Sequence, residues 1–269
     1  MKYSLIASDF DGTIYNGKEV SPKVKKAIAT YRQAGGTFVI ATGRIYPSIR
    51  KLIASVGADD YCVACQGAAF YRVDSGEPIR SFPLPNDLAM KAFRYFEERN
   101  YVFHAYSDKE FFVKEENPLS KAYSEYCAVE PTFVHAPLSL ALPSSFCPNK
   151  IMGIVPEGVI DDCIKEVRAL LGEAVEVSKS SPIFLEITSA KAGKGNCVLA
   201  LADYLGIPRE KTVAVGDNLN DLSMIRVAAV GAAVGNAVEG LKTEADVVLP
   251  PITEDGVADF IERILKDEL

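Results

Sequence analysis

Two apolar segments about two hundred residues apart each end abruptly in aspartates and a glycine. Residues 5–8 lead into Asp-Phe-Asp-Gly-Thr at 9–13, and residues 212–215 lead into Gly-Asp-Asn-Leu-Asn-Asp at 216–221. A short, continuously apolar run is typical of a strand that a parallel sheet buries on both faces. Open α/β folds bind ligands at the carboxyl ends of such strands. The sequence therefore predicts an α/β fold in which acids from both segments line one crevice.

The composition narrows the class of protein. The chain has 269 residues, of which 48% are hydrophobic, so it can bury a large core as one domain or two unequal ones. A net charge of −7 argues against a nucleic-acid binder that uses a basic surface, although a small anionic substrate remains possible. Only His104 and His135 are histidines, which disfavours a histidine metal site or a Ser-His-Asp triad.

Nothing in the sequence indicates a membrane or an export route. No apolar run approaches the ~18 residues of a membrane span, and Ser8 and Asp9 interrupt the first apolar run, which a signal peptide would not do. We therefore expect a cytoplasmic protein whose six cysteines are free thiols. Cys62 and Cys65 have the spacing of a redox motif, but their apolar surroundings favour buried strand cysteines.

Strands alternate with helices in both terminal parts of the chain, which indicates βαβ units and a doubly wound, Rossmann-like parallel sheet. The expected strands are 3–8, 37–41, 61–65, 212–215, 229–234 and 247–249. The expected helices are 23–34, 47–56, 193–205, 219–227, 237–243 and 256–266. Ser21 and Pro22 are a typical helix start.

The middle of the chain has a different pattern, of short aromatic strands and few crossover helices. We expect helices at 87–99 and 159–171 and strands at 101–106, 111–113, 151–155, 175–178 and 183–187. Residues 117–130 stay unassigned, and 131–148 look irregular. The pattern predicts a core from 1–81 and 189–269, with an α+β domain inserted at 82–188.

Asp9 and Asp11 point the same way on an extended backbone, because side chains two residues apart share a face. Together with Asp217 they predict an oxygen-rich Mg²⁺ site. The alternative is a solvated Asp-Gly turn. An EF-hand calcium loop does not fit, because its glycine stands at position six and Gly12 stands at position four.

The second acidic segment, 216–221, opens a helix after a strand. Gly216 lets the backbone approach a ligand, and a helix start offers amide donors. An ordinary helix cap is the alternative, and it explains one aspartate but not the whole polar run.

Two further segments carry groups that suit a phosphoryl ligand. Thr42-Gly43-Arg44 ends a strand, where a hydroxyl and backbone amides can hold an oxygen, although for this segment alone an ordinary strand-to-helix turn is the better explanation. Lys194 stands at a predicted helix start, where the helix dipole repels a cation unless an anion is bound. Lys191 lies three residues away, so spacing alone leaves the choice of lysine open.

A carboxylate nucleophile, a metal, a hydroxyl and a lysine are what phosphoryl transfer through an aspartyl-phosphate requires. Glycine-rich nucleotide loops are absent from the sequence: it contains neither Gly-x-x-x-x-Gly-Lys-Ser/Thr nor Gly-x-Gly-x-x-Gly.

Four motifs follow one another along the chain, at 9–13, 42–44, 194–195 and 216–221. In this order they resemble those of the haloacid dehalogenase superfamily, and specifically its Cof-type sugar-phosphate phosphatases. Residues 233–237 and 254–257 are similar to further marks of that group, and the segment 82–188 matches its large α/β cap in size and place. The chain departs at Gln66-Gly67-Ala68, where the family usually has Asn-Gly-Ala, and at Ile252-Thr253, where an Asn often precedes the acidic pair.

The resemblance implies that Asp9 attacks the phosphorus and becomes a phospho-aspartate. Asp11 then protonates the leaving alcohol and later deprotonates a water. Asp9, the backbone carbonyl of Asp11 and Asp217 hold Mg²⁺. The cap selects the leaving group.

It also implies a set of groups around the phosphoryl oxygens. Those that bind them are Thr42, Lys194, Asn220 and the amide of Phe10. Asp221 orients Lys194 or a metal-bound water, and Gly43 and Arg44 support the site.

Three other activities share parts of this pattern. A phosphomutase shares the motifs and needs water excluded. A dehalogenase needs no metal, so Asp11 and Asp217 argue against it. A non-catalytic sugar-phosphate sensor normally lacks Asp9 or Lys194. We expect a phosphatase for small phosphorylated metabolites; hexose and pentose phosphates, phosphorylated cofactors and flavin nucleotides all fit.

Overall fold

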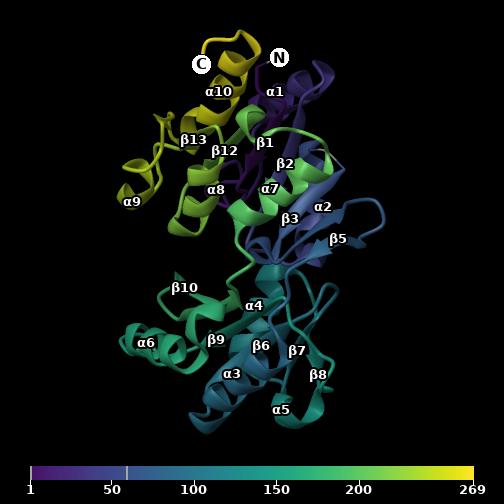
Figure 1. Cartoon of the computed structure of the whole chain (residues 1–269), viewed down its shortest axis with the longest axis vertical. Helices are drawn as coiled ribbons and strands as arrows, with labels where there is room; N and C mark the ends of the chain where they lie inside the picture. Colours follow the sequence, from purple (N-terminus) through teal and green to yellow (C-terminus); the bar gives the residue numbers. More distant parts are fainter. Residues whose placement is uncertain (1, 59) are drawn as a thin grey trace. The chain divides into compact units, whose positions relative to one another are not determined.

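The computed structural model describes residues 2–58 and 60–269, and the chain divides into two compact units (Figure 1). The first unit comprises the residues up to Gly43, Arg50–Ile79 and Gly193–Leu269. The second comprises Arg44–Ile49 and Arg80–Ala192. Within the described residues, no helix has both the length and the apolar character that a membrane span needs.

The first unit is built on a mixed sheet with the order β14-β13-β12-β1-β2-β3-β4-β5. The strands from β14 to β3 pair in parallel, whereas β4 runs antiparallel to β3. Their bounds are Leu5–Ser8 (β1), Thr37–Ala41 (β2), Tyr61–Ala64 (β3), Ala69–Arg72 (β4), Pro78–Ser81 (β5), Thr212–Gly216 (β12), Val230–Ala233 (β13) and Val247–Val248 (β14).

The parallel sheet expected from the sequence is present, and β4 and β5 extend it in a way that the sequence did not predict. The cause is the tight turn Cys65–Gly67, which reverses the chain directly after β3. A turn of three residues cannot contain a crossover helix, so the next strand has to pair antiparallel.

Helices cover both faces of this sheet. Strand order moves one way from β1 to β2 and the opposite way from β12 to β13, so right-handed crossovers place α1 and α8 on opposite faces. Helix α1 packs on α10, and α7 packs on α8. The bounds are Pro22–Gln33 (α1), Tyr46–Val56 (α2), Lys194–Tyr204 (α7), Leu222–Val227 (α8), Glu239–Lys242 (α9) and Gly256–Leu265 (α10).

Helix α1 begins where the sequence predicts. The hydroxyl of Ser21 accepts a hydrogen bond from the amide of Val24 at 3.1 Å, and Pro22 occupies the first turn. Such a cap satisfies one of the amides that the first turn leaves unpaired.

The second unit has a six-stranded sheet with the order β10-β11-β9-β6-β7-β8, antiparallel except between β7 and β8. The strands are Val102–Tyr106 (β6), Phe111–Val113 (β7), Thr132–Phe133 (β8), Lys150–Ile154 (β9), Val175–Ser181 (β10) and Phe184–Ser189 (β11). The helices are Asn86–Glu98 (α3), Pro118–Cys127 (α4), Leu138–Ala141 (α5) and Ile160–Leu171 (α6). The unassigned region 117–130 is thus mostly α4.

The two faces of this second sheet differ in character, because side chains alternate along each strand. Phe103, Ile151 and Leu185 belong to the apolar core that also contains residues of α3 and α6. The other face carries His104, Tyr106, Lys150 and Glu186, all of them buried.

That second face holds a buried polar network. The two ring nitrogens of His104 lie 3.1 Å from the Tyr106 hydroxyl and 2.9 Å from Ser120 Oγ, which α4 supplies. Lys150 Nζ forms a salt bridge with Glu186 Oε1 at 3.0 Å. Burial, and then the charge of Lys150, lower the pKa of His104 to about 3, so this histidine is neutral.

All six cysteines are free. Cys62 and Cys65 are buried, and burial raises the pKa of the Cys62 thiol. A thiol held protonated and away from solvent is unreactive. The interpretation of this pair as buried structural cysteines is confirmed, with Cys65 in the turn after β3 rather than in the strand.

Candidate active site

The site begins where two neighbouring strands end. β1 and β12 pair in parallel, with Ser8 opposite Val215, so the chain leaves both strands at the same edge of the sheet. Asp9 follows β1 directly, and its amide donates to the Val215 carbonyl at 2.9 Å. Asp217 follows β12 directly. This register is the reason that two segments so distant in sequence meet.

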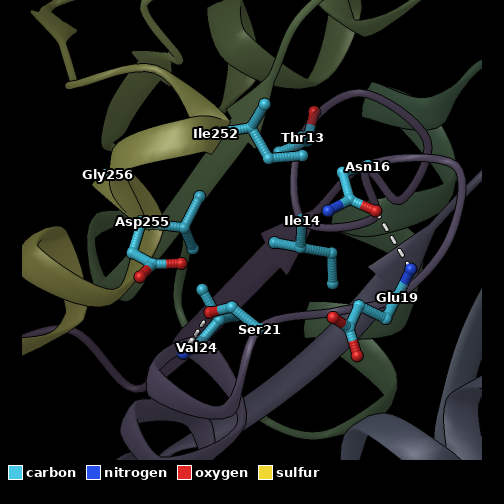
Figure 2. A pocket seen from close by; sticks show the side chains of 10 residues that line it. Thr13, Ile14, Asn16, Glu19, Ser21, Val24, Ile252, Asp255 and Gly256 are labelled. Atoms are coloured by element: carbon cyan, nitrogen blue, oxygen red, sulfur yellow. Dashed lines mark hydrogen bonds between the residues drawn. The ribbon is translucent and has the colours of Figure 1, made fainter.

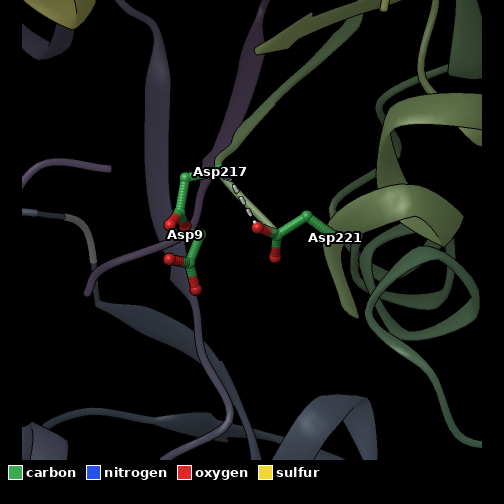
Figure 3. A group of neighbouring side chains, drawn as sticks. All are labelled: Asp9, Asp217 and Asp221. Carbon is green, nitrogen blue, oxygen red and sulfur yellow. Dashed lines mark hydrogen bonds between the residues drawn. The ribbon is translucent and has the colours of Figure 1, made fainter. Parts of the chain in front are cut away.

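Three carboxylates gather at this edge. Asp9, Asp217 and Asp221 each place an oxygen within 4.8 Å of the other two (Figure 3). Asp221 is fully buried, and Asp9 is 5% exposed. Hard divalent cations prefer such oxygen donors. The side chain of Asp11 is not part of this group.

Lys194 lies between two of these carboxylates. Its Nζ is 2.5 Å from Asp9 Oδ1 and 2.6 Å from Asp221 Oδ1, and the side chain is fully buried at the start of α7. Lys191, the other lysine that the spacing left open, is exposed and belongs to the second unit. Lys194 is therefore the cation paired with the predicted nucleophile.

The charges at this edge do not balance, because three carboxylates share one ammonium. Burial raises the pKa of Asp9 well above its usual value; Lys194 opposes this rise, and Asp221 and Asp217 add to it. Burial and then Asp221 also raise the pKa of Asp217. Burial alone would lower the pKa of Lys194, but Asp221 and Asp9 outweigh it and hold the pKa raised. The donor set thus suits a bound cation.

The first acidic loop, residues 9–13, packs closely against the side chain of Asp217. Thr13 Oγ1 lies 3.3 Å from Asp9 Oδ2 and 3.1 Å from Asp217 Oδ1, so its hydroxyl sits between the two carboxylates. Gly12 has φ of +83°, and a Cβ there would lie 2.5 Å from Asp217 Oδ2. Only glycine permits both that backbone conformation and that approach.

Asp221 organises the second acidic loop. Its Oδ2 accepts hydrogen bonds from the amides of Asp217 at 2.9 Å and Asn218 at 3.1 Å, while its Oδ1 binds Lys194. One buried carboxylate thus fixes the backbone of Asp217 and the ammonium of Lys194. Because residues 219–221 form a tight turn, α8 starts at Leu222 rather than at 219 as predicted.

The other predicted phosphate ligands occupy neighbouring strand and helix ends. Thr42 is buried at the end of β2, and its amide donates to the Val63 carbonyl at 2.9 Å. Asn220 lies in the turn before α8, and its Nδ2 donates to Gln66 Oε1 at 3.1 Å. Gly43 lies against Gln66: a Cβ at Gly43 would be 2.6 Å from Gln66 Nε2.

Three more of the predicted site residues, Phe10, Asp11 and Arg44, lie outside the cluster of Asp9, Asp217, Asp221 and Lys194. Phe10 is fully buried and stacks on Tyr15 with ring centroids 4.9 Å apart, which fixes the backbone between the two first-loop aspartates. Asp11 is half-buried. Arg44 groups with the second unit, where its guanidinium lies 5.0 Å from the ring centroid of Tyr126.

The sequence did not assign a role to several residues that support the site, notably Thr13, Gln66 and Asn236. Asn236 donates from Nδ2 to the Gly12 carbonyl at 2.8 Å and accepts at Oδ1 from the Ile252 amide at 2.9 Å. It thereby holds the first acidic loop against the C-terminal segment. Asn236 lies in the segment 233–237, whose similarity to a mark of the haloacid dehalogenase superfamily was the one signal for it in the sequence. Nothing in the sequence paired it with Gly12, 224 positions away.

A small cavity lies beside the first acidic loop, under Thr13 and Ile14 and next to the start of α10 (Figure 2). Its volume of about 20 Å³ is close to what one water molecule needs. The Asn16 and Ser21 side chains that line it are occupied in local hydrogen bonds to the amides of Glu19 and Val24. This cavity is too small for a metabolite.

Comparison with known proteins identifies the family. The family model of the haloacid dehalogenase-like hydrolases matches residues 6–261. The chain belongs to this family. Phosphatase YwpJ of Bacillus subtilis is 26% identical over 284 residues, and the match covers 97% of this chain and 99% of that protein. The 5-amino-6-(5-phospho-D-ribitylamino)uracil phosphatase YwtE, also of B. subtilis, is 28% identical over 286 residues, with 98% of each chain covered.

Solved structures agree with the family assignment. A haloacid dehalogenase-like hydrolase from Bacteroides thetaiotaomicron superimposes with a TM-score of 0.85 at 27% identity, and the match covers 98% of this chain and all of that one. The predicted fold class and the resemblance to haloacid dehalogenase-like proteins are therefore confirmed.

Proposed function

We propose that this haloacid dehalogenase-like hydrolase is a Mg²⁺-dependent phosphatase that acts on small phosphorylated metabolites through an aspartyl-phosphate. The observation that carries the proposal is the meeting of Asp9 and Asp217, at the ends of β1 and β12, with Lys194 at the start of α7. It unites a buried carboxylate, a cation bound to it and a second carboxylate for a metal. Names of relatives such as phosphatases YwpJ and YwtE support the reaction class.

Asp9 is the proposed nucleophile. Lys194 contacts its Oδ1 and Thr13 lies near its Oδ2, so the carboxylate is held in one orientation. One oxygen attacks the phosphorus while the bond to the leaving alcohol breaks. Positioning a nucleophile in this way removes much of the entropic part of the barrier.

Asp11 is the proposed acid and base. As the first step proceeds, its proton passes to the oxygen of the leaving alcohol. In the second step the same carboxylate takes a proton from water, whose oxygen attacks the phosphorus and releases inorganic phosphate from Asp9. The side chain of Asp11 lies outside the three-carboxylate group, which suits a carboxylate that exchanges protons, while the backbone carbonyl of Asp11 stays available to a metal.

The phosphoryl oxygens need donors to offset their charge. We assign this role to Thr42, Lys194, Asn220 and the backbone amide of Phe10. Asp221 fixes Lys194. Gly43 and Arg44 directly follow Thr42 and help to hold its loop in place. Fixed donors of this kind stabilise charge in the transition state without reorganising.

Asp9, Asp217 and the carbonyl of Asp11 would hold the Mg²⁺. The excess of carboxylates over ammonium groups at this edge fits such an ion, which would neutralise phosphoryl charge and orient the ester. Asp221 is already occupied by Lys194 and two amides, so we place it outside the metal's ligands.

The inserted region, close to 82–188, is proposed to select the leaving group, and no nucleic acid or membrane partner is proposed. The cytoplasm is the proposed location, which six free cysteines support.

A substrate panel tests the proposal. Hexose and pentose phosphates, phosphorylated cofactors and flavin mononucleotide are each incubated with the protein, and phosphate release is measured with Mg²⁺ or with EDTA. We expect release that requires Mg²⁺ and that calcium supports poorly, because calcium favours longer bonds and more ligands. Conversion of a sugar phosphate to its isomer without free phosphate would instead establish a phosphomutase, and metal-independent release would contradict the proposed mechanism.

A further inference from the structure

The turn between β3 and β4 has an unusual backbone. Cys65, Gln66 and Gly67 have φ values of 52°, 57° and 84°, so three successive residues lie in the left-handed region. Glycine adopts this conformation freely and asparagine often does, but glutamine and cysteine rarely do. Strain of this kind persists where surrounding contacts hold the backbone in place, which is common at functional sites.

Gln66 is held at both its backbone and its side chain. Its amide donates to the Thr42 carbonyl at 3.1 Å, and its Oε1 accepts from Asn220 Nδ2 at 3.1 Å. One residue thereby joins the loop after β2 to the turn before α8, across 154 positions of sequence. Both of the joined residues, Thr42 and Asn220, are phosphate ligands in the function proposed above.

Gly43 leaves the space that this arrangement needs. Any Cβ at Gly43 would approach Gln66 Nε2 to 2.6 Å, which is closer than real contacts allow. A side chain at position 43 would therefore require the Gln66 carboxamide to move from its present place.

We propose that Gln66 is a positioning residue that aims the carboxamide of Asn220 at a phosphoryl oxygen; this rests on the proposed function. The two hydrogens on Asn220 Nδ2 lie in one plane, so binding one of them to Gln66 sets the direction of the other. A reversed Asn220 amide would bring its oxygen against the oxygen of Gln66, two acceptors facing each other. Gln66 thus keeps the donor end of Asn220 toward the phosphoryl group.

A double-mutant cycle separates this role from a merely structural one. Gln66→Met keeps the length and unbranched shape of the side chain but removes the acceptor, and Asn220→Ala removes the amide. We expect Gln66→Met to lower kcat/KM about 5- to 10-fold, the scale of one hydrogen bond, when Asn220 is present. In the Asn220→Ala background the same change should alter kcat/KM by less than about 2-fold, because coupled residues are not additive.

The affinity for inorganic phosphate gives a second readout that does not require turnover. Titration calorimetry with inorganic phosphate and Mg²⁺ should show the same coupling in the dissociation constant. Gln33→Met, at the chain's exposed glutamine, is the matched control and should change neither quantity. Circular dichroism and thermal melts establish folding; if Gln66→Met misfolds, Gln66→Gly removes the acceptor and the backbone strain together and completes the cycle.

An equal loss in both backgrounds, or no loss in either, overturns the positioning role. A wild-type protein that hydrolyses no ester of the panel overturns the proposed function instead, and the phosphate-binding cycle still reports on Gln66 in that case.

Discussion

At the scale of single residues, the site depends on side chains that each hold two partners. Lys194 binds Asp9 and Asp221, and Asp221 in turn binds two backbone amides. Removing one member of such a buried set leaves others unpaired, which is more costly than losing an exposed ion pair. Substitutions that keep shape are therefore the informative ones.

Asp9→Asn is expected to abolish phosphate release and leave the fold intact. The amide has nearly the same shape but cannot form the phospho-aspartate, so kcat should fall by at least about 10³-fold. Steady-state kinetics with the best substrate of the panel measures it, with Asp203→Asn, an exposed aspartate of α7, as the control. Near-normal release by the pure Asp9→Asn protein would end the nucleophile assignment.

Asp11→Asn is expected to discriminate between leaving groups. An aryl alcohol is a good leaving group and needs little protonation, whereas an alkyl alcohol needs a proton from Asp11. In single-turnover phosphorylation the alkyl ester should therefore lose far more rate than the aryl ester. Asp9→Asn serves as the control, because it should affect both esters alike. Equal losses in Asp11→Asn would argue against Asp11 as the acid.

At the scale of elements, helix α4 covers a sheet face that carries charged and polar side chains. His104 bonds to Ser120 of α4 and to Tyr106 of its own strand, and the Lys150–Glu186 pair lies on the same face. Buried polar groups are tolerated when each finds partners, and they fix one arrangement of the elements that supply those partners.

The buried histidine gives the stability a specific pH dependence. The pKa of His104 is about 3 in the fold and about 6.5 in an unfolded chain, so unfolding takes up a proton between these values. Above about pH 6.5, His104 is neutral in both states and does not lower the free energy of unfolding. As the pH falls from about 6.5 toward 3, the free energy of unfolding decreases by about 1.4 kcal/mol per pH unit. Urea unfolding at several pH values should show this extra slope in the wild type and lack it in His104→Gln.

His135→Gln, at the exposed histidine, is the matched control for that series and should keep the wild-type slope. A His104→Gln protein with an unchanged slope would mean that another group takes up the proton.

The elements also show how far the sequence leads. Asp9 and Asp217 could be predicted to meet, because parallel strands end at one edge and the apolar runs marked those strands. Helix α4 could not be predicted, because its buried residue Tyr123 lies in a segment whose composition is largely polar. Strand β4 could not be predicted either, because the reversal of the chain after Ala64 depends on backbone angles that hydrophobic periodicity does not reveal. The Gln66–Asn220 contact depends on two loops meeting, which spacing does not encode.

At the scale of the whole molecule, one compact unit is made from both ends of the chain and the other from a nearly continuous segment. The proposed phosphate and metal ligands all belong to the first unit or its loops. The second unit supplies none of these ligands, so its sequence can vary with the substrate. We therefore expect the second unit to encode the substrate specificity.

Exchanging the inserted region tests this. Residues 82–188 are replaced by the corresponding segment of a relative with a different substrate preference, and the panel is repeated. The preference should follow the inserted segment while Mg²⁺ dependence stays unchanged, since discrimination requires contacts to the part of the substrate that differs. The reciprocal chimera is the control. A well-folded chimera with the original ranking would place selectivity in loops of the first unit.

The central place of β1 has a consequence for how the protein is made. β1 pairs on one side with β12, and Leu5 stands opposite Thr212. A ribosome adding about 5–20 residues per second completes β12 about 10 to 40 s after β1. During that interval the edge of β1 that pairs with β12 has no partner strand. The second unit is synthesised completely in the same interval and can form its own sheet. Nascent chains are thus expected to need chaperones most at their first strand, and the cluster of Asp9, Asp217 and Asp221 is among the last features to form.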